Sequence, residues 1–190
     1  MNLHVKHRMT VEEFLAWADA RRASLPFDEP KWELFDGVPV MQEHEKWIHA
    51  RLKFEITVAI KAAIAQSGLH FEAGVDGLGV RISPRESYQP EIAVFPKGLI
   101  ADDDRFAPDP ILVVEVLSPS TRRTDLREKV AGYGQVATIE HYLVVDPKPR
   151  EILHYRRQGR LLIEPAAPLT SGVLRLDPPG LEIPLSAMFA

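Results

Sequence analysis

The sequence feature that most constrains the fold of this chain is the run ILVVEVL at residues 111–117. Six of its seven residues are aliphatic, which is typical of a strand that is buried on both faces of a sheet. Glu115 interrupts the run. Because an ionised carboxylate costs several kcal/mol to bury alone, Glu115 must be paired, protonated or bound to a metal ion. The run therefore predicts a central strand that carries either a structural ion pair with an arginine or a functional acid.

Local signals predict helices and a hairpin in the N-terminal part of the chain. Thr10 and Glu13 form a capping box that opens a helix over 10–22. The dipeptide Asp36-Gly37, between two short β-like runs, predicts a two-residue hairpin. Apolar residues that recur every four positions predict the longest helix over 44–67, and Gly68 ends it.

Strand-like runs dominate the remainder of the chain. A helix over about 125–135, with Thr124 as its candidate N-cap, separates two groups of strands. The strands are predicted near 71–75, 78–82, 91–95, 111–117, 141–146, 151–156 and 160–164, with shorter runs near 173–176 and 181–185. This order of elements predicts a mixed α/β fold in which helices pack on one β-sheet.

Length and composition exclude several classes of protein. A chain of 190 residues, of which 45% are hydrophobic, is expected to form a single domain. The absence of cysteine excludes a disulfide scaffold, a thiolate zinc site and a cysteine nucleophile. No apolar run approaches the roughly 20 residues of a membrane span, and the N-terminus lacks the apolar core of a secretory signal. We therefore expect a cytoplasmic protein.

The charge balance bears on possible partners. Lys and Arg number 23 against 27 Asp and Glu, which gives a formal net charge of −4. Dense coating of nucleic acid requires a strongly basic face, so this mode of binding is not expected. A nuclease needs only a local basic rim and is compatible with the composition.

Two acids point to a divalent metal site. Glu91 follows Pro90 at the start of the run PEIAVF, and Glu115 lies within the next predicted strand. If these strands are neighbours, the two carboxylates lie side by side at one end of the sheet. They would then offer the hard oxygen ligands that Mg²⁺ and Mn²⁺ prefer. The alternative for Glu91 is an exposed charge at the start of a strand.

The predicted helix over 125–135 and the hairpin add further candidates. Asp125, Lys129 and Tyr133 are spaced four apart and share one stripe of the helix. Lys129 can point back toward Glu115, where it would orient a water or offset charge on a phosphate oxygen. The alternative is a surface pair between Asp125 and Lys129. Glu33, in the hairpin, is either a fourth site residue or an exposed strand charge, and the sequence does not link it to Glu115.

Spacing excludes other catalytic patterns. His44 and His49 resemble the pair of a zinc-protease HExxH helix, but they are five residues apart, which turns them roughly 140° away from each other. The chain has no P-loop sequence and no G-x-S-x-G elbow. The glycines at 74, 77 and 79 lack a following helix and do not form a dinucleotide fingerprint.

Several segments, taken in order, resemble one protein family. They are TVEEFL, WELFDGVPV, PEIAVF, LVVEVLSPSTRRTDLREKVAGY and HYLVVDP. They are similar to a bacterial family of restriction-endonuclease-like proteins, the Uma-type family of the PD-(D/E)xK nuclease superfamily. The resemblance runs from about Met9 to Asp146, with weaker similarity to Met188. It implies one restriction-endonuclease-like domain over 1–190, with a core at about 9–146 and a C-terminal strand extension at 147–190. The implied fold is a mixed central β-sheet flanked by helices.

The resemblance also implies roles for individual residues. The family's metal-binding acids correspond to Glu91 and Glu115, the acid of its YELxDG-like segment to Glu33, and its helix lysine to Lys129. Further motif positions fall on Asp125 and Tyr133, which are possible accessory residues.

The chain departs from the superfamily pattern at two positions. Glu91 stands where the superfamily usually has Asp, and its side chain is longer by one methylene. Leu117 stands where the lysine of E-x-K is usual. Lys129 is the natural replacement for that lysine.

The resemblance implies hydrolysis of phosphodiester bonds in DNA by an endonuclease that depends on Mg²⁺ or Mn²⁺. Arg122, Arg123 and Arg127 would supply a basic rim for the DNA backbone, unless they only form a solvated helix start. A homodimer or higher homo-oligomer is expected, because two-fold symmetry suits the cutting of a duplex. The alternative is a non-catalytic oligomeric or nucleic-acid-associated protein on a nuclease fold, in which the acids have a structural role.

Overall fold

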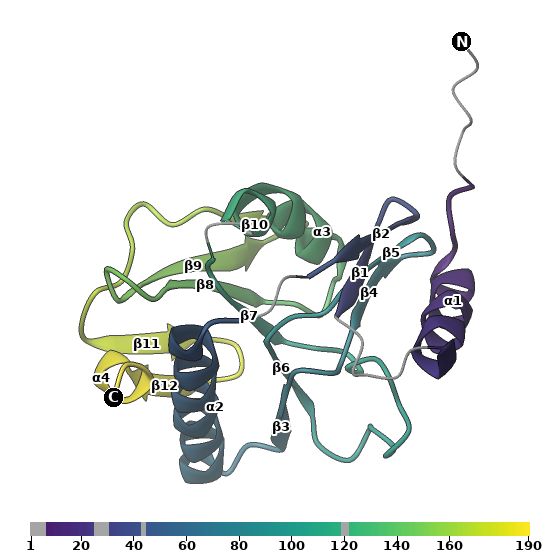
Figure 1. Cartoon of the computed structure of the whole chain (residues 1–190). Coiled ribbons are helices and arrows are strands. Elements are labelled where there is room, and N and C mark those ends of the chain that lie inside the picture. The colour runs from purple at the N-terminus through teal and green to yellow at the C-terminus, as the bar shows by residue number, and fades with distance from the viewer. Residues whose placement is uncertain (1–6, 25–30, 43–44, 119–121) are drawn as a thin grey trace.

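The computed structural model describes residues 7–24, 31–42, 45–118 and 122–190. Its centre is a six-stranded mixed sheet with the order β10-β9-β8-β7-β6-β3, and a second sheet of four strands has the order β2-β1-β5-β4. Figure 1 shows the smaller sheet beside the central one, with α1 next to it. With the separate pair of strands β11 and β12, the described residues form three sheets where the sequence predicted one.

The elements have the following bounds. The helices are α1 (Val11–Ser24), α2 (Trp47–Ser67), α3 (Lys129–Gln135) and α4 (Leu185–Met188), and a π-helical turn over Thr124–Glu128 precedes α3. The central sheet contains β3 (Phe71–Val75), β6 (Ile92–Pro96), β7 (Leu112–Val116), β8 (His141–Asp146), β9 (Glu151–Gln158) and β10 (Leu161–Ile163). The smaller sheet contains β1 (Trp32–Phe35), β2 (Val38–Met41), β4 (Val80–Ser83) and β5 (Glu86–Tyr88), and β11 (Val173–Leu176) pairs with β12 (Leu181–Pro184). Within the described ranges, none of the helices combines the length and apolar character that a membrane crossing requires.

Strand β7 separates two hydrophobic layers. Its residues Leu112, Val114 and Val116 pack in the layer that contains α2, α4 and the β11–β12 hairpin. Val113 packs in the other layer, with α3 and the smaller sheet. All five residues of β7 are buried, which confirms the prediction of a strand buried on both faces. Because side chains alternate along a strand, Glu115 lies on the side of α3.

Local capping and turn signals were sufficient to predict three element boundaries. The backbone N–H of Thr10 donates to Glu13 Oε2 at 2.8 Å, and that of Glu13 donates to Thr10 Oγ1 at 3.2 Å, as a capping box requires. Asp36 and Gly37 have φ of 45° and 76°, which is the geometry of a type I′ hairpin turn. Gly68 ends α2 with φ of 69°.

The prediction of a single sheet and that of an N-cap at Thr124 were wrong. The hairpin β1–β2 does not join the central sheet, because Leu34 pairs with Ser87 of β5, a three-residue strand that the sequence did not reveal. Thr124 is not an N-cap, since the preceding Arg123 already has helical dihedral angles and no capping side chain. The strand predicted near 181–185 is confirmed as β12, which ends at Pro184, and the next residue begins α4.

A buried histidine pair joins the central sheet to the loop between β11 and β12. His141 Nε2 lies 2.6 Å from the carbonyl oxygen of Pro178, and His141 Nδ1 lies 3.0 Å from His154 Nε2. Because a carbonyl oxygen only accepts, both neutral rings carry their proton on Nε2, and His154 donates to His141. Burial lowers the pKa of both rings, that of His154 from 6.5 to about 3.

We expect the free energy of unfolding to fall as the pH is lowered from about 6.5 toward 3, because the unfolded chain binds protons at these histidines in that window and the folded chain does not. Urea unfolding of the wild type and of H154Q at about pH 7.5 and about pH 5.5, above the ordinary carboxylate range, measures this contribution. The wild type should lose more stability over the interval than the variant. Equal losses would contradict a lowered histidine pKa.

Candidate active site

Glu115 on β7 is held by two residues of α3. Its Oε1 accepts hydrogen bonds from Lys129 Nζ and from the hydroxyl of Tyr133, each at 2.8 Å. The Glu115 side chain is only 5% exposed and that of Lys129 only 4%. An arginine partner, the alternative raised by the sequence, is therefore wrong: the cation that pairs with Glu115 is a lysine on the following helix.

Lys129 also brings Glu33 and Asp125 into the same cluster. Its Nζ lies 3.0 Å from Glu33 Oε1 and 3.4 Å from Asp125 Oδ1. Glu33 further accepts from the backbone N–H of Gln89 at 2.8 Å and from Gln42 Nε2 at 2.6 Å. Because both carboxylates are fully buried, the alternatives of an exposed strand charge for Glu33 and of a surface pair for Asp125 are wrong.

The cluster of Glu33, Glu115, Asp125 and Lys129 holds three carboxyl groups around one ammonium. Burial, reinforced by the charges of Asp125 and Glu33, raises the pKa of Glu115 well above its ordinary value, and Lys129 offsets this only in part. Burial alone would lower the pKa of Lys129, but the surrounding carboxylates outweigh it and raise that pKa well above its ordinary value. The lysine is therefore protonated, and the cluster carries excess negative charge whenever all its acids are ionised.

Glu91 lies next to β7, just before the start of β6. The antiparallel register pairs Ile92, the first residue of β6, with Val114, the residue before Glu115. The backbone N–H of Glu91 donates to the carbonyl of Val114 at 3.1 Å, which keeps the two strands together at this point. Adjacent strands are about 4.8 Å apart, so Glu91 and Glu115 lie at the same end of this pair of strands.

The register continues to a third acid that the sequence analysis missed. Strand β3 pairs with β6 so that Val75 lies opposite Ile92, and the next residue, Asp76, stands opposite Glu91. The backbone N–H of Asp76 donates to the carbonyl of Glu91 at 3.0 Å. Asp76 and Glu91 are therefore paired at the end of the β3–β6 ladder, and Glu91 in turn is bonded to Val114, the residue before Glu115. Asp76 has a φ of 52° and is followed by Gly77. In the sequence, the dipeptide Asp76-Gly77 indicates only a turn.

His49 on α2 fills the space next to the position of the absent E-x-K lysine. Its Nε2 lies 2.7 Å from the carbonyl oxygen of Leu117 and so carries the proton, while its Nδ1 lies 3.6 Å from Glu91 Oε1. The interaction with Glu91 raises the pKa of His49 above its ordinary value, against the opposing effect of burial. His44, the other histidine of the HExxH-like segment, lies outside the described residues.

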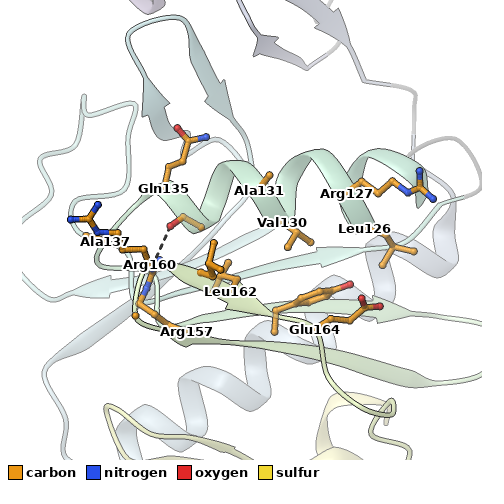
Figure 2. A pocket seen from close by; sticks show the side chains of 14 residues that line it. Leu126, Arg127, Val130, Ala131, Gln135, Ala137, Arg157, Arg160, Leu162 and Glu164 are labelled. Atoms are coloured by element: carbon orange, nitrogen blue, oxygen red, sulfur yellow. Dashed lines mark hydrogen bonds between the residues drawn. The ribbon is translucent and has the colours of Figure 1, made fainter.

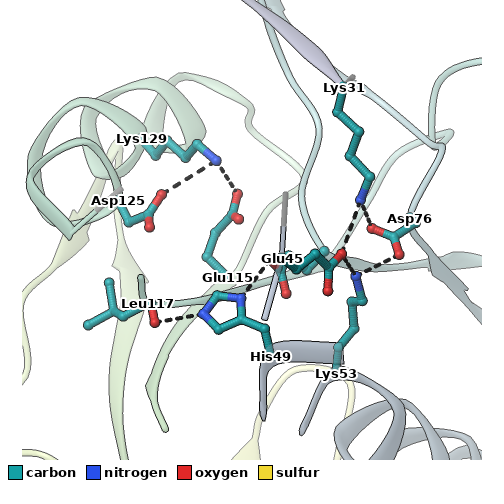
Figure 3. A network of polar contacts seen from close by, with 10 residues as sticks. Lys31, Glu45, His49, Lys53, Asp76, Glu115, Leu117, Asp125 and Lys129 are labelled. Carbon is teal, nitrogen blue, oxygen red and sulfur yellow. Dashed lines mark hydrogen bonds and ion pairs between the residues drawn. The ribbon is translucent and has the colours of Figure 1, made fainter. Parts of the chain in front are cut away.

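A second charged cluster lies beside His49 and consists of Lys31, Glu45, Lys53 and Asp76 (Figure 3). Lys53 is one turn after His49 on α2, pairs closely with Glu45, and lies 2.7 Å from Asp76 Oδ2. Lys31 pairs closely with Asp76 and lies 3.8 Å from Glu45 Oε1. The sequence analysis missed both lysines. One signal was available for Lys53: together with His49, it interrupts the buried apolar face of α2, as Glu115 interrupts β7.

The donor set is suited to a hard divalent cation. Glu91 Oε2 is buried and has no hydrogen-bond partner, and the backbone of Glu91 bonds to Val114, the residue before Glu115. A buried carboxylate oxygen without a donor is a costly feature that a cation would compensate. Within the part of the chain that the structure describes, no three His, Asp or Glu side chains already converge as a preformed metal cage. The residues therefore fit a site with two protein carboxylates, the remaining ligands coming from water or substrate, which is usual for Mg²⁺.

The three candidate arginines lie around the start of α3. Arg122 pairs with Asp146 at 2.7 Å, and Arg122, Arg123 and Arg127 are all exposed. Arg127 lines a groove of about 700 Å³ between α3 and strands β9 and β10 (Figure 2). The α3 residues that line this groove, such as Val130 and Gly134, alternate with Lys129 and Tyr133, which contact Glu115. The groove is therefore distinct from the acidic cluster, and Arg157 hydrogen bonds backbone carbonyls along its floor.

The chain matches known proteins over most of its length. A family model described as Uma2, "Putative restriction endonuclease", matches residues 11–186. An uncharacterized protein of Synechocystis sp. is 27% identical over 119 residues, which cover 58% of this chain and 63%, or less than two thirds, of that relative. A crystal structure described as a putative nuclease belonging to DUF820 from Anabaena variabilis aligns with a TM-score of 0.72 at 18% identity, over 95% of this chain and 97% of that one. The likeness in structure confirms the predicted fold, a mixed central sheet flanked by helices.

Proposed function

The chain belongs to the Uma2 family of restriction-endonuclease-like proteins, and from this premise we propose that it is a divalent-metal-dependent nuclease that hydrolyses phosphodiester bonds of DNA. One observation carries the proposal: Glu115 lies in a buried aliphatic strand, hydrogen bonded to Lys129, at the end of the strand where Glu91 bonds to Val114. An aliphatic residue at this position would pack at lower cost. Perturbed buried acids of this kind gather at functional sites.

In this proposal Glu91 and Glu115 hold Mg²⁺ or Mn²⁺. A bound ion would supply the positive charge that stabilises the transition state of phosphodiester hydrolysis and activates water. Lys129 and Tyr133 fix the Glu115 carboxylate in place through its Oε1, and Glu33 and Asp125 keep Lys129 charged and immobile. Arg122, Arg123 and Arg127 would contact the DNA backbone along the neighbouring rim.

The burial of the cluster favours a second candidate function. Glu115 and Lys129 are almost entirely covered, and the most accessible of the two proposed metal ligands is Glu91, whose side chain is 18% exposed. In a non-catalytic nucleic-acid-associated protein, the same ion pairs would serve only to hold β1, β7 and α3 together. The two functions differ in whether a divalent cation binds and whether DNA is cut.

The nuclease proposal predicts that wild-type protein nicks supercoiled plasmid with Mg²⁺ or Mn²⁺ and not with a chelator. E91Q should reduce the rate at least about 100-fold, because several kcal/mol of transition-state stabilisation depend on the ion. The metal should also raise the melting temperature of the wild type and not that of E91Q. E182Q changes the charge equally at an exposed residue and serves as the control.

Two results would contradict the nuclease proposal. The first is nicking that persists in chelator and in E91Q, which would indicate a contaminating or metal-independent activity. The second is a wild-type protein that neither cuts DNA nor changes its melting temperature with metal, which would favour the non-catalytic function. We further propose that duplex cleavage uses two copies of the chain related by a two-fold axis. Sedimentation equilibrium should then give twice the mass of the chain.

A further inference from the structure

Lys31 and Lys53 converge on the same two carboxylates, those of Glu45 and Asp76. Glu45 and Lys53 lie 8 residues apart around the start of α2, whereas Lys31 comes from the segment before β1 and Asp76 from the end of β3. The tertiary fold therefore brings Lys31 and Asp76 to the start of α2. Lys53 is buried, whereas the side chains of Lys31, Glu45 and Asp76 are 39%, 29% and 34% exposed, so that one side of the cluster is open to solvent.

The two carboxylates of this cluster are held differently. Asp76 is anchored, because its backbone N–H donates to Glu91 in the continuation of the β3–β6 ladder. Glu45 lies outside any helix or strand, ahead of the first turn of α2. Its carboxylate contacts both lysines, yet rotation of this one side chain would uncover them. The lysines would then retain Asp76 as a fixed partner and accept a second anion in place of Glu45.

Burying Lys53 in the apolar face of α2 has a cost that a purely structural role does not require. Lys53 lies among Leu52, Ile56 and His49 on this face. An ammonium there loses hydration, and its ion-pair partners offset that loss only when the geometry of the pairs is good. The surrounding carboxylates, Asp76 and Glu45 foremost and Glu91 beyond them, keep it protonated by raising its pKa despite burial. A permanently charged, partly shielded cation beside Glu91 is what a phosphate oxygen would bind.

We propose that Lys31 and Lys53 form a binding site for a backbone phosphate of DNA, and that the Glu45 carboxylate occupies this site in the free protein. The identity of the ligand rests on the proposed nuclease function, since Asp76, which contacts both lysines, is paired with the proposed metal ligand Glu91. Lys129 is enclosed by Glu33, Glu115 and Asp125, and so Lys31 and Lys53 are the cations of this region that an incoming phosphate can reach once Glu45 turns away.

Binding of a labelled DNA duplex, measured by fluorescence anisotropy in chelator so that no cleavage occurs, tests this site. E45Q removes the competing charge and should tighten binding about fivefold, as loss of a partly exposed ion pair of about 1 kcal/mol implies. The control is E55Q, which makes the same change of charge at a residue of α2 that pairs with Arg51. A gain of affinity in E45Q beyond that of E55Q cannot result from misfolding.

The salt dependence of the same binding gives a second readout. K53M should lower the slope of log K against log salt by about 0.9, the value for one phosphate contact on B-form DNA. R51M, which removes a cation from the exposed side of the same helix, should leave the slope closer to that of the wild type. A purely structural lysine would alter melting temperature without changing the slope.

Each outcome of these binding measurements either supports or contradicts the proposed phosphate site. Tighter binding by E45Q together with a smaller slope for K53M supports the phosphate site. Equal affinities of E45Q and E55Q, or an unchanged slope in K53M, overturns it. Failure of every variant and of the wild type to bind duplex overturns both this site and DNA as the substrate. Binding without metal-dependent cleavage leaves the phosphate site standing and removes the nuclease function.

Discussion

Replacing Lys129 with methionine is expected to lower the free energy of unfolding by about 3–5 kcal/mol, because it leaves buried carboxylates without their cation. Lys129 lies within 3.4 Å of oxygens of Glu33, Glu115 and Asp125, and all three side chains are buried. With the ammonium gone, these acids must take up protons or draw in water. Urea unfolding at neutral pH measures the change, and K61M, at an exposed position of α2, is the control.

A double variant separates lost charge from lost packing. In K129M/E115Q one of the stranded carboxylates is neutral, so this variant should recover on the order of 1–3 kcal/mol relative to K129M, which is the usual size of coupling between contacting residues. Additive losses in the double variant would contradict a direct interaction. Any K129M protein that remains folded should cleave DNA about 10²–10³ times more slowly, because Glu115 is no longer held in position.

Replacing Glu115 with glutamine is expected to abolish cleavage while preserving the fold. The amide oxygen can still accept from Lys129 and Tyr133, yet it is a poor ligand for Mg²⁺, so the rate should fall at least about 100-fold. E182Q again provides a control of equal charge. Cleavage by E115Q at the wild-type rate would remove Glu115 from the active site.

The stability of E115Q should change with pH in a defined direction. Because the pKa of Glu115 is raised in the folded protein, the folded state holds a proton that the unfolded state has lost between the ordinary value of 4.5 and the raised one. The wild type therefore loses stability as the pH rises through this window, and the glutamine variant does not. Urea titration at about pH 5 and about pH 8 measures the free energy of unfolding of both proteins. Relative to the wild type, E115Q should be more stable at pH 8 than at pH 5.

The positions of Lys129 on one side and of Lys31 and Lys53 on the other suggest different roles for these lysines. Lys129 is enclosed by carboxylates and acts through Glu115, so we regard it as a positioning residue. Lys53 and Lys31 lie on the open side, near Glu91, where the proposed phosphate site would contact substrate. In this proposal Lys129 on α3 holds Glu115 in place, whereas Lys53 on α2 and Lys31 before β1 bind the phosphate.

Much of the fold was predictable because its signals are local. The continuous aliphatic run of β7, the capping box at Thr10 and the turn at Asp36-Gly37 each depend on residues within a few positions of one another. The second sheet was not predictable in this way. Strand β5 has only three residues, and it exists because it pairs with β1 and β4, which are distant from each other in sequence.

The candidate site also contains features that local sequence predicts and features that it does not. The sequence by itself determined that Glu115 is an acid in a buried strand and that Asp125, Lys129 and Tyr133 share a helical stripe, because burial and periodicity are properties of contiguous residues. Only the tertiary structure placed Glu33 on Lys129 and aligned Asp76 with Glu91. It alone also brought Lys31 and Lys53 to the same carboxylates. Contacts between side chains 14 to 96 positions apart depend on strand register and sheet order, which a one-dimensional pattern does not contain.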